Sequence, residues 1–201
     1  GRKESWRDEG VTPPAGVVEK EVRKGIEPKS QVTIVFTGPM NAPASERVAL
    51  DALALALENR LRLTVREALQ GSYGVEVRAT AQPIPSPRYS VTIDFGCDPK
   101  RADELVKSVF QDIGALREKG PTDREVSDAR EALLRRHETS LARNPSLVGE
   151  ISDRLENGED LSTYFGLPRE YRQLTPRMVQ DAARRYLDPG RYVRVTLYPE
   201  R

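Results

Sequence analysis

The sequence predicts an α+β fold in two layers, with a largely antiparallel sheet and helices packed on one face. Stretches in which apolar and polar residues alternate occur in pairs within residues 17–37 and 73–95, and once more at residues 192–197. Between and after these pairs, apolar residues recur every three or four positions, which is the period of an amphipathic helix. The resulting order of elements, ββ, α, ββ, α, α, (α), α, β, is typical of a sheet with helices on one face.

The composition narrows the class of protein. The chain has 201 residues, of which 37% are hydrophobic and 31% charged, as expected for a globular protein with a substantial core. Its 32 Lys and Arg residues against 31 Asp and Glu residues leave a net charge of +1, so no basic excess indicates a nucleic-acid partner. No apolar run approaches the roughly 20 residues of a membrane helix, and the first residues lack the apolar segment of a signal peptide. We therefore expect neither a nucleic acid nor a membrane as partner, and the compartment stays unknown.

The first half of the chain divides into a tail and the start of a domain. Residues 1–16 are charged and Pro-rich, which indicates a linker or tail, and residues 17–201 are predicted to form a single α+β domain. Two strands are predicted at 17–23 and 31–37, on either side of a turn containing Gly and Pro. From Ala44 a long helix runs to a cap near Gly71. Its apolar face consists of Leu50, Leu53, Leu57, Leu61 and Val65.

The middle of the chain predicts a strand pair followed by two helices. Residues 73–79 and 89–95 alternate as neighbouring antiparallel strands do, and a Pro-rich loop joins them. Asp98 and Pro99 begin a helix that stops at Gly120. Thr122 and Glu125 have the spacing of a capping box for the next helix, whose many charges are expected to form a solvated face.

The last third is less regular. The segment SLVGEISDRLENGED is compatible with a helix, whereas STYFGLPREYRQL is predicted to be irregular, with Tyr164, Phe165 and Tyr171 as anchors. Thr175 and Pro176 begin a final helix that runs to about Leu187, and a strand from Tyr192 follows it.

Few residues could carry catalysis. His137 is the single histidine, so this chain cannot by itself supply the several ligands of a catalytic zinc site, and no G-x-S-x-G elbow accompanies it. It lies at the margin of an apolar helical face, which favours a packed side chain over a metal ligand. Cys97 lies between a strand end and a helix start, where a thiol pKa can fall, but a small buried residue is the preferred interpretation. Considered from its residues alone, the chain is a non-catalytic domain without a metal site.

Several stretches resemble a known family when taken in order. They are VREALQGSYGVEV (65–77), GPTDREVSDAREALLRR (120–136) and LTPRMVQDAARRYLDPGRYVRVTLYPE (174–200), preceded by ESWRDEGVTPPAGVVEKEVRKGIEPKSQVTIVFTGP (4–39). Over about residues 17–199 the chain resembles the C-terminal part of the pitrilysin/insulinase-type zinc metallopeptidases. The resemblance implies an α+β domain repeated along a longer polypeptide.

The resemblance also implies a divided active site. In that family the N-terminal half holds zinc on an H-x-x-E-H motif, and two halves enclose a chamber for unfolded peptides. We therefore expect no cofactor in this chain, zinc in the missing N-terminal half of the same polypeptide or of a partner subunit, and an unfolded peptide as substrate. By resemblance, Arg66 would hold a substrate backbone carbonyl, and Tyr73 would hydrogen-bond the substrate or the oxyanion. The family is compatible with the bacterial periplasm or cytoplasm.

Simpler interpretations stand beside this one. Arg66 near a helix C-terminus gains about 0.3 to 1 kcal/mol from the helix dipole without any functional role, and Tyr73 could anchor a strand end. The whole chain could instead be a scaffold or assembly domain of an inactive family member. A third alternative is a stand-alone peptide-binding module that uses an exposed sheet edge.

Overall fold

The sheet of this protein is built from both ends of the chain. The computed structural model describes residues 9–40, 44–69 and 74–200. Five strands form one sheet in the order β1-β5-β2-β4-β3, in which β1 and β5 are parallel and all other neighbours antiparallel. The strands are β1 (Val17–Arg23), β2 (Ser30–Pro39), β3 (Val75–Gln82), β4 (Arg88–Cys97) and β5 (Tyr192–Tyr198). The C-terminal strand β5 thus lies between two N-terminal strands, β1 and β2.

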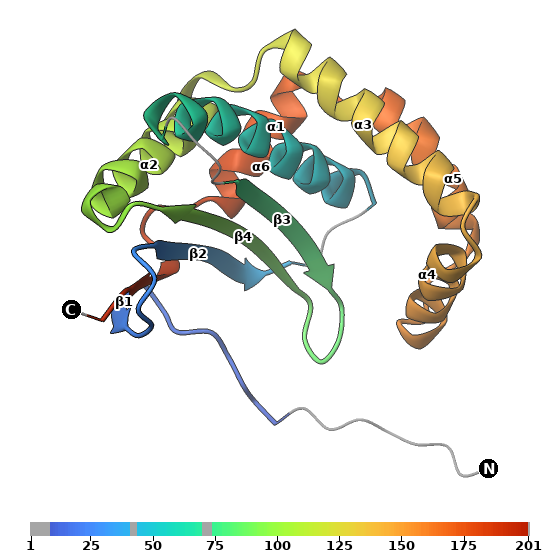
Figure 1. The fold of residues 1–201 in the computed structure, drawn as a ribbon. Helices are drawn as coiled ribbons and strands as arrows, with labels where there is room; N and C mark the ends of the chain where they lie inside the picture. Colours follow the sequence, from blue (N-terminus) through green and yellow to red (C-terminus); the bar gives the residue numbers. More distant parts are fainter. Residues whose placement is uncertain (1–8, 41–43, 70–73, 201) are drawn as a thin grey trace.

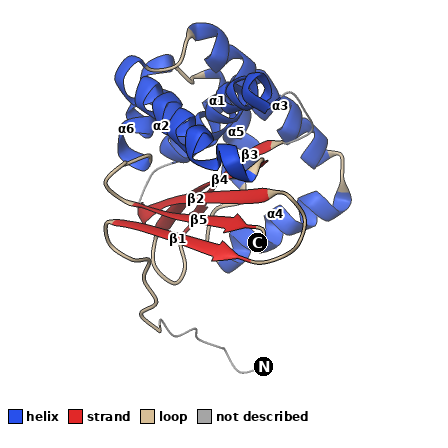
Figure 2. Cartoon of the chain, turned by 60° about the vertical axis from the view of Figure 1, so that its left-hand side comes forward, coloured by secondary structure: helices blue, strands red, loops and turns tan. Residues whose placement is uncertain are grey.

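Helices cover one face of the sheet, which confirms the predicted two-layer α+β fold (Figure 2). The helices α1, α2 and α6 lie over the sheet, while α3, α4 and α5 extend beyond it (Figure 1). The helices are α1 (Ala44–Leu69), the short η1 (Pro99–Arg101), α2 (Ala102–Lys119), α3 (Asp123–Leu141), α4 (Asn144–Glu156), α5 (Ser162–Arg172) and α6 (Pro176–Tyr186). β1 begins at Val17, where the predicted domain begins, and the division into tail and single domain stays a prediction.

The core lies between the sheet and α1. Because side chains alternate across a strand, Val32, Ile34 and Phe36 of β2 all face the helices, and each is fully buried. The predicted apolar face of α1 packs on this side of the sheet. The leucines of that face are at most 1% exposed: Leu50, Leu53, Leu57 and Leu61. Periodicity therefore identified these four buried residues of α1 correctly, while the side chain of the fifth, Val65, lies outside the described residues.

β5 places Thr196 and its two tyrosines, but not its aliphatic residues, toward the helices. Thr196 pairs with the buried Val32 and is itself only 3% exposed, so the two share a face. The aliphatic residues of the strand, which include Val195 and Leu197, consequently lie on the opposite face. No helix of the described part of the chain covers that face (Figure 2).

One predicted segment is wrong. The stretch STYFGLPREYRQL was expected to be irregular, but most of it forms α5, which runs from Ser162 to Arg172 with Pro168 inside it. Tyr164 and Tyr171 are seven positions apart, so they share one helix face, and both are buried. Burying these rings offsets the backbone hydrogen bond that Pro168 cannot donate. The third predicted anchor, Phe165, is 58% exposed, and its ring lies 5.6 Å from that of its neighbour Tyr164, centroid to centroid.

A capping box begins α3, as the Thr122 and Glu125 spacing predicts, and Arg60 links it to α1. The Thr122 hydroxyl accepts from the Glu125 backbone N–H at 3.2 Å, and the Glu125 carboxylate accepts from the Thr122 backbone N–H at 2.7 Å. Arg60 of α1 donates to both carboxylate oxygens of Glu125, with Nη2 2.8 Å from Oε2, and its Nη2 also reaches the Gly120 carbonyl at 3.2 Å. Hydrogen bonds from Arg60 and Thr122 lower the pKa of Glu125 to about 2.

We expect Glu125→Gln to lower the free energy of unfolding by about 1 to 3 kcal/mol at pH 7. The unfolded glutamate has a pKa near 4.3, and the folded value is depressed, so its contribution is present above about pH 4.3 and is lost as the pH falls toward 2. Urea unfolding of the wild type and the variant at pH 7 and pH 3 measures both the loss of stability and its dependence on pH. The control is Glu131→Gln on the exposed surface of the same helix, where Glu131 pairs loosely with Arg135 at 3.7 Å, and should change stability by less than about 0.5 kcal/mol. Equal losses in the two variants would contradict the role of the Arg60 contact.

Candidate functional site

The pair predicted to have a function, Arg66 and Tyr73, flanks the connection between α1 and β3. The backbone of Arg66 belongs to the C-terminal part of α1, which ends at Leu69, and β3 starts at Val75. The side chain of Arg66 and the whole of Tyr73 lie outside the described residues. The predicted change from helix to strand is therefore present, while the roles of the two side chains stay predictions.

His137 is a packed side chain. It is 5% exposed, and its ring lies 4.7 Å from that of Tyr164 and 6.3 Å from that of Tyr171, centroid to centroid. Burial lowers the pKa of His137, against the opposite effect of Glu150 and Glu138. Within residues 9–40, 44–69 and 74–200, no group of three or more His, Cys, Asp or Glu side chains could hold a metal ion. The interpretation of His137 as a packed residue agrees with this environment.

Cys97 is also a buried residue, as interpreted from the sequence. It is fully buried at the end of β4, and burial, with a smaller effect from Asp98, raises the pKa of its thiol to about 11. A raised pKa keeps a thiol protonated at neutral pH, which disfavours attack by its sulfur.

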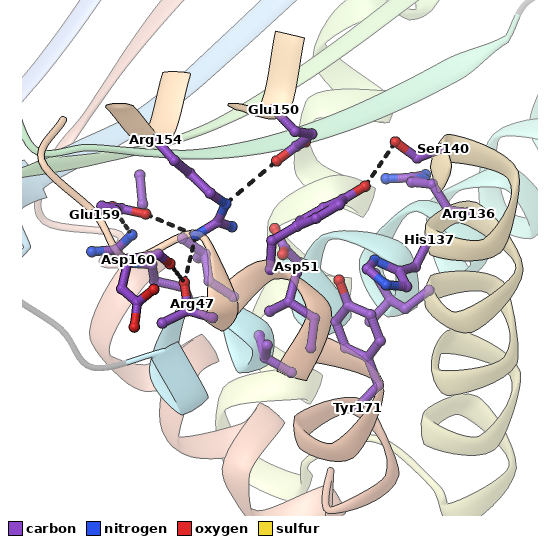
Figure 3. Close-up of a pocket in the computed structure, with 17 residues that line it drawn as sticks. Arg47, Asp51, Arg136, His137, Ser140, Glu150, Arg154, Glu159, Asp160 and Tyr171 are labelled. Atoms are coloured by element: carbon purple, nitrogen blue, oxygen red, sulfur yellow. Dashed lines mark hydrogen bonds and ion pairs between the residues drawn. The ribbon is translucent and has the colours of Figure 1, made fainter. Parts of the chain in front are cut away.

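A cavity that the sequence does not predict lies on the helical side of the molecule (Figure 3). Its volume is about 580 Å³, and its walls come from the N-terminal half of α1, the C-terminal half of α3, α4, α5 and the end of β3. Its lining combines charged side chains with the rings of His137, Tyr164 and Tyr171. The charged residues that matter below are Arg47, Asp51, Arg136, Glu150, Arg154 and Glu159.

Ion pairs hold one wall of this cavity in place. Glu159 accepts from Arg47 of α1 at 2.5 Å and from Arg154 of α4 at 2.9 Å. Arg154 also donates to the Thr163 hydroxyl at 2.8 Å, and its Nε lies 3.8 Å from the Glu150 carboxylate. Since α4 has no fully buried residue, these contacts, with its packing on α3, fix its position. The arginines at positions 47 and 154 therefore already have anionic partners.

Asp51 differs from the other acids of the cavity. It lies in the middle of the lining residues, with Arg154, Glu159 and Arg47 on one side and His137 and Tyr171 on the other (Figure 3). Burial raises the pKa of Asp51 to about 7; Arg136 opposes this effect, and Glu150 adds to it. Asp51 is half-buried, and no described residue donates a hydrogen bond to its carboxyl group. A carboxyl group of this kind is near half ionisation at neutral pH.

The sequence contained one signal for this residue. Asp51 is the only charged residue in the run VALDALALAL, residues 48–57, whose other members are Val, Ala and Leu. A lone acid in an apolar helical run lies at or beside a buried face, and an ionisable group in such a position is a candidate functional residue. The partners that surround it come from three later helices, so their identity was not accessible from the run itself.

Comparison with known proteins identifies the family. Residues 3–133, more than half of the chain, match the family described as the peptidase M16 inactive domain. The chain belongs to this family. That result confirms the predicted resemblance to zinc metallopeptidases.

This M16 inactive domain spans about a sixth of the length of the curated relatives that it matches. It is 28% identical to the probable zinc protease PqqL of Escherichia coli over 149 residues. The matched stretch makes up 74% of this chain and 16% of that protein. The crystal structure of the periplasmic protease PqqL from Escherichia coli matches with a TM-score of 0.79 and 25% identity, over 96% of this chain and 21% of that one. The inactive peptidase domain of a putative zinc protease from Bordetella parapertussis matches with a TM-score of 0.69 and 20% identity, over 88% of this chain and 94% of that one. At 20% identity this last likeness shows the fold alone.

The cavity and the predicted Arg66 and Tyr73 turn occupy different parts of this M16 domain. Asp51 and Arg66 both belong to α1, and at 1.5 Å per residue their Cα atoms are about 22 Å apart along its axis. The two sites can therefore be tested separately. In the described part of the chain, no helix is long and apolar enough to cross a membrane.

Proposed function

We propose that this M16 domain is the non-catalytic C-terminal domain of a zinc metalloendopeptidase, in which it closes the chamber for an unfolded peptide. The match of residues 3–133 to the inactive M16 domain carries this proposal, and the similarity to the probable zinc protease PqqL supports it. The 201 residues have one histidine and no H-x-x-E-H motif, so zinc would be held by the N-terminal half. That half belongs to the same polypeptide or to a partner subunit.

Arg66 and Tyr73 are proposed to bind the peptide. When a water held by zinc attacks a peptide carbonyl, negative charge develops on the carbonyl oxygen. A guanidinium is a permanent cation with several N–H donors, which suits a substrate backbone carbonyl. A phenol is a neutral O–H donor, which suits the developing oxyanion. Neither side chain performs hydrolysis without the zinc-bearing half.

The uncovered face of the sheet is consistent with a second half packing against this one. It carries the apolar residues Val195 and Leu197 of β5, and Leu197 is 37% exposed. A mixed apolar and polar sheet face is a surface that another domain or a bound peptide can cover. Both periplasm and cytoplasm suit this role, and the periplasmic location of PqqL from Escherichia coli favours the periplasm.

The proposal is tested by hydrolysis of an unfolded peptide by the full-length protein that contains these residues. We expect Arg66→Ala and Tyr73→Phe each to lower kcat/KM at least about tenfold, which equals about 1.4 kcal/mol of transition-state stabilisation. Tyr73→Phe removes only the hydroxyl group, so a loss in that variant assigns the effect to its hydrogen bond. The control is Arg62→Ala, one helical turn earlier in α1, where the side chain is 61% exposed and pairs with Glu58.

Two outcomes would contradict parts of this proposal. Unchanged kcat/KM in both variants would remove the assigned roles of Arg66 and Tyr73. A full-length wild-type protein that hydrolyses no peptide in the presence of zinc would favour a scaffold or assembly function instead.

A further inference from the structure

The charges that line the cavity leave one carboxyl group without a partner. Arg47 and Arg154 both bind Glu159, and Arg154 also lies beside Glu150. Asp160 accepts from the backbone N–H and the hydroxyl of Ser162 at the start of α5. Arg136 is exposed and lies within electrostatic range of Asp51, but it makes no ion pair with it. Asp51 is half-buried at the wall of this cavity, and unlike Glu150, Glu159 and Asp160 it makes no ion pair or hydrogen bond with a described side chain.

A carboxylate in such a position favours a cationic ligand. Burying a charge without a partner costs several kcal/mol, and a donor cation recovers much of that cost. An ammonium or guanidinium group supplies both the positive charge and N–H donors. A bound anion would instead meet Asp51, Glu150 and Glu159, and two of the three lining arginines, Arg47 and Arg154, are already paired with Glu159, which leaves the exposed Arg136.

Aromatic rings beside Asp51 add to this preference. Cations bind over tyrosine faces at about 6 Å or less. The cavity already has one example, because the Arg154 guanidinium lies 5.3 Å from the centroid of the Tyr164 ring. Tyr171, whose ring is also buried, lies next to Asp51, and no described residue hydrogen-bonds to its hydroxyl (Figure 3). A ligand cation could therefore bind Asp51 and contact Tyr171 together.

We infer that this cavity binds the basic side chain of a peptide, a lysine or an arginine, with Asp51 as its anionic partner and Tyr171 beside it. A volume of about 580 Å³ lies within the range of small-ligand pockets, about 300 to 1,000 Å³, and accommodates a long flexible side chain. The inference rests on the proposed function in taking a peptide as the source of the cation. The site is separate from the predicted Arg66 and Tyr73 pair and from the zinc-bearing half.

Binding to Asp51 requires its ionised form, so a proton and the ligand compete for one group. The charged and titratable groups that face Asp51 come from each helix of the cavity: Arg47 from α1, Arg136 and His137 from α3, Glu150 and Arg154 from α4, and Tyr164 and Tyr171 from α5. Since burial raises the pKa of Asp51 to about 7, it gains its charge between pH 6 and pH 8. The affinity for a basic side chain should thus rise with pH through neutrality.

The test uses the full-length protein with zinc removed by a chelator, so that no peptide is cleaved. The probes are two short Gly and Ser peptides with blocked ends, one with a central lysine and one with norleucine, which has nearly the same shape but no charge. At pH 8 we expect the lysine peptide to bind at least about tenfold more tightly than the norleucine peptide. Its Kd should also fall about tenfold from pH 6 to pH 8, as the ionised fraction of Asp51 rises.

Variants assign the effect to Asp51. Asp51→Asn should bind both peptides equally and lose the pH dependence. The matched control, Asp128→Asn, removes an exposed carboxylate of α3 that lies outside the cavity and should keep the wild-type preference. The inference would be overturned if the wild-type protein bound the lysine and norleucine peptides with equal Kd at pH 8. It would also be overturned if Asp51→Asn kept the preference for the lysine peptide. Because zinc is absent from this assay, its failure is distinguishable from a failure of the proposed hydrolytic function.

Discussion

Asp51→Asn is expected to stabilise the folded chain by about 2 to 4 kcal/mol at pH 8 and by only about 1 kcal/mol at pH 5. The pKa of Asp51 is raised from near 3.9 in an unfolded chain to about 7 in the fold, so the folded state binds the proton more tightly. Its stability is greatest when the group is protonated and falls as the pH rises from about 4 through 7. Asparagine removes the charge and hence this pH-dependent loss. Water within the cavity screens part of the effect, which is why the lower end of the range is included.

Urea unfolding of the 201-residue chain at both pH values measures this effect. The exposed Asp128→Asn serves as control and should shift the free energy of unfolding by less than about 0.5 kcal/mol at either pH. A stabilisation by Asp51→Asn that is the same at pH 5 and pH 8 would show that ionisation is not its cause. A destabilisation at pH 8 would show that the carboxylate has a donor in solution.

Leu57→Ala is expected to lower the free energy of unfolding by about 2 to 5 kcal/mol, because it opens a cavity where α1 packs in the core. Leu57 is fully buried near the middle of α1, the helix that carries both Asp51 and Arg66. Leu63 of the same helix is 62% exposed, so Leu63→Ala is the matched control, with an expected change within about 0.5 kcal/mol.

Denaturant unfolding followed by circular dichroism separates these two leucine variants. The expected result is a large fall in the midpoint for Leu57→Ala at an unchanged m-value, and almost none for Leu63→Ala. If both variants lost the same stability, the assignment of the buried face of α1 would be wrong. A changed m-value would instead indicate a different folded or unfolded ensemble.

The predictions that succeeded were those that depend on neighbouring residues. The face of α1 around Leu57 follows from a three and four residue period, and the capping box of Thr122 and Glu125 follows from two residues three positions apart. Both signals involve residues that are close together in the chain, so they can be read from the amino-acid sequence alone. The prediction for α5 failed because Gly166 and Pro168 are local signals against a helix. The burial of Tyr164 and Tyr171 against other helices outweighed them.

The sequence by itself determined the kinds and order of the elements other than α5, the absence of an H-x-x-E-H motif, and the family to which the domain belongs. The tertiary structure alone decided that β5 lies between β1 and β2, because strand order depends on pairing between the two ends of the chain. It also decided the environment of Asp51, which appears in the sequence as one acid in an apolar run. The ionisation of a carboxyl group depends on the water and charges around it, and here residues of α3, α4 and α5, far along the chain, displace that water. No local pattern can contain that information.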